Sequence, residues 1–132
     1  MPAELPLLWE GRNRRRIASL EPEVRPLVRQ LVEAALEEDI LLVITEGRRT
    51  RARQRELYAQ GRTTPGPIVT WTLDSKHIDG KAFDVGVLDA DGKLTWPDDD
   101  ELWERIGRLG ERARLRWGGR WKKPDRPHFE AR

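Results

Sequence analysis

The sequence contains no cysteine, a single asparagine (Asn13) and only two histidines. The absence of cysteine excludes disulfides, thiolate nucleophiles and every zinc site that uses cysteine ligands. Any metal ion must therefore be held by histidine and carboxylate side chains. With so few histidines, the placement of His77 and His128 decides whether the chain can form such a site.

Long apolar segments are also absent. The longest apolar run, residues 40–44, is far shorter than the roughly 20 residues that a helix needs to cross a bilayer. The N-terminal residues lack the basic and then apolar order that is typical of a signal peptide. We therefore expect synthesis in the cytoplasm without membrane anchoring. A substrate outside the membrane would then require release by another agent.

Charge of one sign does not dominate, because 25 basic residues accompany 23 acidic ones and the formal net charge is +2. Residues 1–18 end in an arginine cluster at positions 12–16, and we interpret this segment as a solvated N-terminal leader. Attraction of the cluster to an anionic polymer is the alternative. Because four arginines are few for a nucleic-acid site, we expect no nucleic-acid partner. We expect the protein to be a monomer.

Hydropathy patterns predict a mixture of helices and strands in a single domain, residues 1–132. The expected helices begin at Ser19, at Thr50 and after Pro97. Short strands are expected at residues 40–45, 82–88, 93–96, 115–117 and 128–130. This order of elements favours an α+β fold in which the helices pack on one face of a small antiparallel sheet.

The first of two chemically informative segments places His77 and Asp84 seven residues apart. Gly80 lies between them, and a turn there would bring both side chains to one site. A histidine and a carboxylate are suitable ligands for zinc, although spacing alone leaves a structural role for His77 open.

The second segment contains Asp125, Pro127 and His128. Proline restricts the backbone beside His128, and a metal ligand needs such rigid placement. Three nitrogen or oxygen ligands would leave the fourth tetrahedral position of Zn²⁺ open for water, as catalytic zinc sites require. Asp125 is near a ligand in sequence without having to be one, so it is the candidate general base.

The pattern Ser-x-His-x-x-Gly-x-Ala-x-Asp over residues 75–84, followed far downstream by an acidic residue three before a second histidine, resembles the D-alanyl-D-alanine metallopeptidases. This family includes the VanX and VanY enzymes of vancomycin resistance and the phage L-alanyl-D-glutamate endopeptidases. Residues 46–54 and 60–66 also resemble family segments, and the similarity covers roughly residues 19–130. The resemblance implies a zinc peptidase that acts on the peptidoglycan stem peptide.

Carried over by position, the resemblance implies that three residues bind zinc: His77, Asp84 and His128. It implies that Asp125 is the general base and that Arg49 polarises the scissile carbonyl and stabilises the oxyanion. A planar, permanently charged guanidinium suits that second role. Arg48 stands where the family has an aromatic residue, so either arginine could face the site, and the register of Thr50 and Gln54 favours Arg49.

Four further residues have weaker assignments. Ser75 matches a serine beside the family's site and is expected to contact substrate or support a ligand. Trp117 and Trp121 would line a substrate groove, with packing in the core as the alternative. Glu130 shares a strand face with His128 and either orients that ligand or is a plain surface carboxylate.

Family members differ in the bond that they cut. The loop at residues 60–66, the minimal chain and the missing export signal favour the L-alanyl-D-glutamate bond and a phage endolysin that is released through a holin-type lesion. The alternatives are a D,D-carboxypeptidase or dipeptidase acting on D-Ala-D-Ala ends, and a non-catalytic wall-binding module of the same fold. Asp125 argues against the binding module, because binding alone needs no base.

Overall fold

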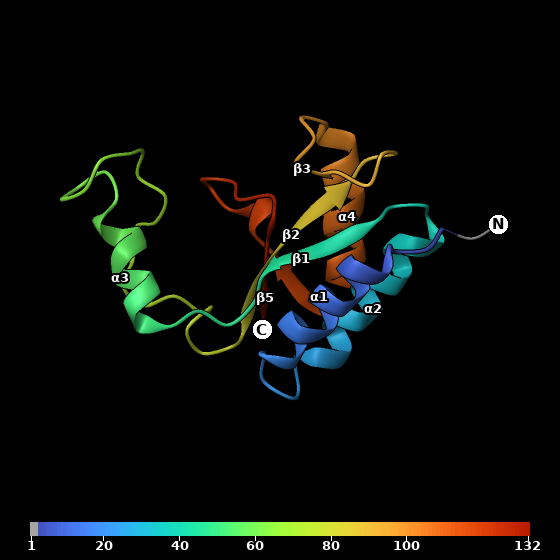
Figure 1. Cartoon of the computed structure of the whole chain (residues 1–132), viewed down its shortest axis with the longest axis horizontal. Helices are drawn as coiled ribbons and strands as arrows, with labels where there is room; N and C mark the ends of the chain where they lie inside the picture. Colours follow the sequence, from blue (N-terminus) through green and yellow to red (C-terminus); the bar gives the residue numbers. More distant parts are fainter. Residues whose placement is uncertain (1–2) are drawn as a thin grey trace.

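Five strands form one open antiparallel sheet in the computed structural model, which describes residues 3–132 (Figure 1). The sheet order is β1-β2-β5-β4, and the short β3 pairs with the end of β2. The strands are β1 (Leu42–Glu46), β2 (Ala82–Leu88), β3 (Leu94–Thr95), β4 (Leu115–Trp117) and β5 (His128–Ala131). The helices are α1 (Leu7–Ala18), α2 (Arg25–Glu37), α3 (Arg51–Ala59) and α4 (Asp100–Arg112), with a 3-10 turn at Gly118–Arg120. The predicted α+β class is confirmed.

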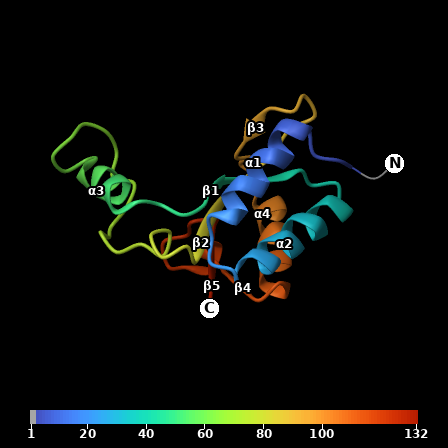
Figure 2. The same cartoon turned by 60° about the horizontal axis from the view of Figure 1, so that its bottom comes forward.

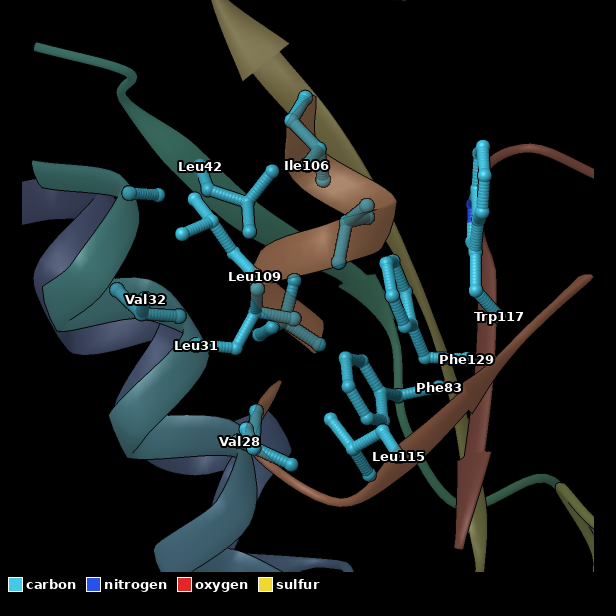
Figure 3. Close-up of a cluster of buried hydrophobic side chains, with 14 of the residues drawn as sticks. Val28, Leu31, Val32, Leu42, Phe83, Ile106, Leu109, Leu115, Trp117 and Phe129 are labelled. Carbon is cyan, nitrogen blue, oxygen red and sulfur yellow. The ribbon is translucent and has the colours of Figure 1, made fainter. Parts of the chain in front are cut away.

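Three helices, α1, α2 and α4, lie together on one side of the sheet, whereas α3 stands apart from them (Figure 2). Side chains from the three helices and from four strands meet in one apolar core (Figure 3). The two phenylalanine rings at its centre, Phe83 of β2 and Phe129 of β5, are stacked with centroids 5.7 Å apart. Burial of this apolar surface is the main force that holds the helices on the sheet.

The alternation of side chains along the strands separates the core from the polar residues. Phe83 and Val85 of β2 face the helices, and Asp84 between them faces the other side. In β5, Phe129 joins the core, so His128 and Glu130 lie on the same face as Asp84. The sheet therefore presents its chemically active residues on the face opposite the helices.

Residues 7–18 form a helix that contributes Ile17 to the core, so the prediction of a solvated leader is wrong for this stretch; residues 1 and 2 lie outside the residues that the structure describes. Helix α1 covers the free edge of β1. Asn13 Oδ1 accepts a hydrogen bond of 2.7 Å from the Ile44 amide, and Arg16 Nη1 donates one of 2.6 Å to the Ile44 carbonyl. These side chains bind backbone groups that an edge strand would otherwise expose for pairing with another chain.

Replacing Asn13 by alanine should lower the free energy of unfolding by about 1–3 kcal/mol, because it leaves the buried Ile44 amide without its acceptor. Urea denaturation measures the change. Arg14→Ala is the control on the same helix, since Arg14 is exposed and pairs with the exposed Glu10. Equal stability of the two variants would show that Asn13 does not stabilise the strand edge.

The other predicted elements are close to those observed, with one boundary moved. Ser19 ends α1 instead of starting α2, which begins at Arg25 with Pro26 in its first turn. Thr50 caps α3 as expected, because its side chain accepts a hydrogen bond from the Arg53 amide. Among residues 3–132, no helix is both long enough and apolar enough to cross a membrane.

Candidate active site

Three side chains meet above the polar face of the sheet: His77, Asp84 and His128. Asp84 of β2 is directly opposite His128 of β5 in the strand register. His77 comes from the loop before β2, which reverses at Gly80, where φ is +71°. Because L side chains rarely adopt that backbone conformation, glycine permits the turn that the sequence predicted.

The ligand atoms of these residues form a nearly equilateral triangle. His77 Nε2 lies 3.3 Å from His128 Nδ1 and 3.4 Å from Asp84 Oδ1, and the third edge, from His128 Nδ1 to Asp84 Oδ1, is 3.2 Å. Tetrahedral zinc with bonds of roughly 2.0–2.1 Å needs ligand atoms about 3.3 Å apart. The donor set and its spacing therefore fit a zinc ion with one open position.

Hydrogen bonds outside the triangle determine which imidazole nitrogens remain available. His77 Nδ1 lies 3.1 Å from the Gly47 carbonyl, which can only accept, so this nitrogen carries the proton and Nε2 is free to bind metal. His128 Nε2 lies 3.0 Å from the Glu130 carboxylate, so Nδ1 is the nitrogen that faces the other two residues of the triangle. Both rings thus turn the nitrogen that would bind a metal ion toward the triangle.

Charges in the site are strongly coupled. Burial alone would raise the pKa of Asp84, but the neighbouring imidazoles of His128 and His77 hold it well below its usual range. Burial opposes the charged form of His128, yet hydrogen bonds to Asp84 and Glu130 prevail and raise the pKa of His128 to about 9. A metal ion must therefore displace a proton from His128 at neutral pH.

Glu130 orients His128 instead of being a plain surface carboxylate. The hydrogen bond from His128 lowers the pKa of Glu130 to about 2, and Lys76 Nζ lies 2.6 Å from its second oxygen. The ionised carboxylate is thus fixed between the imidazole and the ammonium group. In the sequence, the alternation of side chains along the strand placed Glu130 on the same face as His128. No sequence pattern indicated that Lys76 pairs with Glu130.

Removing this carboxylate by Glu130→Ala should weaken zinc binding roughly 10- to 100-fold, the usual cost of losing a partner that orients a ligand. Competition against a chromophoric chelator measures the affinity. Glu130→Gln is the matched control, because its amide oxygen still accepts from His128, and its loss should be smaller. If both variants bind zinc as tightly as the unaltered protein, Glu130 does not support the site.

Asp125 lines the same cleft, and its backbone packs closely against Gly118, which also lies against His128. Its amide donates to the Gly118 carbonyl at 2.9 Å, and a Cβ on Gly118 would lie 2.5 Å from the Asp125 carbonyl oxygen. Glycine at that position therefore allows the loop to fold beside His128. Desolvation, followed by the nearby Asp84 charge, raises the pKa of the Asp125 carboxyl.

Arg49 and Arg48 point to different places. Arg49 lines the cleft, where its guanidinium binds Glu46 Oε1 and Gln54 Oε1, each at 2.7 Å. Arg48 lies outside it and pairs with Glu21 on the surface. A bulge in β1 between Ile44 and Glu46 turns Glu46 to the polar face, opposite Asp84, where it can hold Arg49.

The cleft has a volume of about 520 Å³ and is bounded by the sheet, the loop before β2 and helix α3. Ser75 lines it, and its Oγ accepts a hydrogen bond of 3.2 Å from the His77 amide. Trp121 also lines it, half exposed, with its ring centroid 4.9 Å from that of His128. Trp121 therefore lies in the cleft, and its contact with substrate stays a prediction.

Trp117 does not line the cleft, so its predicted substrate-binding position is wrong. Its ring is buried in the core, and Nε1 donates to the Arg126 carbonyl at 2.8 Å. The direction follows from strand alternation, since Trp117 is paired with the core residue Phe129. The structure instead adds Trp71 to the cleft wall, a loop residue that no sequence pattern had indicated.

Comparison with known proteins agrees with this geometry. Residues 69–131 match the family described as D-alanyl-D-alanine carboxypeptidase. The chain is 33% identical over 136 residues to the peptidoglycan L-alanyl-D-glutamate endopeptidase CwlK of Bacillus subtilis (strain 168), with 92% of this chain and 81% of that protein covered.

Two solved structures have a similar fold. The L-Ala D-Glu endopeptidase ChiX of Serratia marcescens matches with a TM-score of 0.75 and 28% identity, over 92% of this chain and 87% of that one. The vancomycin-resistance D,D-pentapeptidase VanY, solved with Zn(II), matches with a TM-score of 0.62 and 16% identity, over 85% of this chain and 72% of that one. At that identity the second match bears on the fold alone.

Proposed function

Since the chain belongs to the D-alanyl-D-alanine carboxypeptidase family of metallopeptidases, we propose that it is a zinc-dependent peptidoglycan hydrolase that cuts the bond between L-alanine and D-glutamate in the stem peptide. The observation that carries this proposal is the triangle of His77, Asp84 and His128 in one cleft with Asp125. Two relatives named for that same bond support the choice of substrate.

In this proposal the three residues of the triangle hold zinc, and Asp125 and Arg49 carry out the remaining chemistry. When bound, the ion supplies Lewis acidity and a water molecule of lowered pKa. Asp125 takes the proton that the attacking water loses and delivers it to the nitrogen of the leaving amine, so that the proton is conserved across the reaction. The guanidinium of Arg49, oriented by Glu46, stabilises the negative charge that develops on the carbonyl oxygen.

Ser75 and Trp121 are assigned to substrate binding in the same proposal. Both line the cleft beside the triangle, Ser75 in the loop that carries His77 and Trp121 against the ring of His128. A half-exposed indole offers a large apolar surface to a substrate at little cost in conformational entropy. We propose that this apolar surface contacts the substrate beside the reacting bond.

The alternative is a D,D-carboxypeptidase, which the description of the matched family favours. Mass spectrometry of digested peptidoglycan distinguishes the two activities, because each leaves a different product. The endopeptidase creates new amino termini on D-glutamate, whereas the carboxypeptidase releases D-alanine. Release of D-alanine without new D-glutamate termini would refute our assignment. A digest with chelator is the control for metal dependence.

The biological setting that we propose is that of a phage endolysin released through a holin-type lesion. The lysin-like loop at residues 60–66 supports it. Expression inside a host with and without a holin tests this part. We expect rapid lysis only when both proteins are present, and lysis by the enzyme alone would contradict the need for a lesion.

A further inference from the structure

A second groove is lined in part by Asp125. It has a volume of about 450 Å³, and its walls include Trp96, Pro97, Pro124, Arg126 and Pro127. Asp125 lines both this groove and the cleft that contains the zinc ligands. The two spaces therefore share the residue assigned as the general base.

Trp96 forms a fixed aromatic surface in this groove. Its Nε1 donates a hydrogen bond of 2.9 Å to the carbonyl of Val85, the residue after Asp84, while 53% of the side chain stays exposed. Pro127 and Pro124, whose rings restrict the backbone, precede His128 and Asp125 in sequence. An exposed indole held at one edge beside a reaction centre is well placed to bind a flat apolar surface.

We propose that this groove binds the muramyl sugar to which the stem peptide is attached, with the less polar face of the pyranose ring on Trp96. The inference rests on the proposed function. In peptidoglycan only L-alanine separates the L-alanyl-D-glutamate bond from the lactyl group of the sugar. One residue spans about 3.5 Å, so only this short residue and the lactyl group separate the sugar from the cut bond.

The cleft and the second groove differ in the polarity of their walls, as the peptide and sugar parts of this substrate require. The larger cleft is lined mainly by polar and charged side chains, which suit the polar remainder of the stem peptide. The second groove is walled by tryptophan and proline, with Arg126 as its cationic donor. Arg126 is partly exposed and held by Asp98 and Asp100, so its guanidinium is positioned to donate to the acetamido or hydroxyl oxygens of a sugar.

The first test compares two substrates that contain the same peptide bond. One is the free stem tripeptide, and the other is the same tripeptide attached to the wall disaccharide. The unaltered enzyme should have a higher kcat/KM for the glycopeptide by roughly tenfold, the size of one good aromatic contact. Trp96→Ala should bring the ratio of the two kcat/KM values close to one. General damage to the zinc site lowers both values and leaves the ratio unchanged.

Trp9→Ala is the matched control, because Trp9 lies on α1 and lines neither the cleft nor the groove. It should keep the full preference for the glycopeptide. Equal rates of the unaltered enzyme on both substrates would overturn the sugar site and leave the proposed function intact. Release of D-alanine instead would refute the proposed bond.

Binding of the sugar is also measured without turnover. The wall disaccharide that lacks peptide is titrated into the protein, and the Trp96 indole N–H resonance is followed by NMR. A saturable shift at Trp96, with the Trp9 resonance unchanged, supports the site. An unmoved Trp96 resonance at millimolar disaccharide overturns it, whatever the enzyme cleaves.

Discussion

Replacing His77 by alanine is expected to abolish zinc binding and peptide hydrolysis together. The triangle loses one of its corners, and the two remaining ligands, Asp84 and His128, cannot hold the ion in a tetrahedral site. The loss of affinity should exceed the roughly 10- to 100-fold expected for a residue that only orients a ligand. Because the ion binds the folded chain, the variant should also lose the stabilisation that zinc provides, about 4 kcal/mol at a thousand times Kd.

Thermal unfolding with and without zinc measures both consequences. The unaltered protein should unfold at a higher temperature with zinc, and a chelator should remove this difference. His77→Ala should unfold at the same temperature in both conditions. Asp79→Ala, an exposed position two residues further along the same loop, should behave like the unaltered protein. A zinc-dependent shift that persists in His77→Ala would mean that other residues bind the metal.

Two residues of the triangle could be predicted because their signals are local. His77 and Asp84 are joined by a short turn at Gly80 and a strand, so their proximity depends on few residues. The strand at Ala82–Leu88 was predicted with its observed boundaries, since β2 is apolar on both sides of Asp84. His128 is different, because its place opposite Asp84 depends on the pairing of β2 with the distant β5, and the sequence implied it only through the family resemblance.

Features that depend on distant pairing were not predictable in this way. Helix α1 buries only Asn13 and Ile17, so its apolar pattern is weak and its arginines resemble a solvated segment. Hydrogen bonds to the free edge of β1 hold the helix in place, and the sequence alone does not show which strand lies at the edge of the sheet. The direction of Trp117 likewise depends on its partner Phe129, and that of Glu46 on a bulge in β1.

Asp125→Asn is expected to lower kcat by roughly 10²- to 10⁴-fold, the usual contribution of a positioned general base. Zinc affinity should stay close to that of the unaltered protein, because Asp125 is not part of the triangle. Kinetics on the stem peptide and chelator competition measure the two quantities separately. Asp79→Asn, the same exchange at an exposed position in the loop of His77, should leave both unchanged.

The stability of this variant separates a catalytic role from a structural one. Desolvation and the charge of Asp84 raise the pKa of Asp125, which means that the fold disfavours the carboxylate relative to the neutral acid. A neutral asparagine should therefore fold at least as stably as aspartate at pH 7. A carboxylate that costs stability and lines both the cleft and the second groove fits the proposed role of general base. Normal turnover of Asp125→Asn would show that another group accepts the proton.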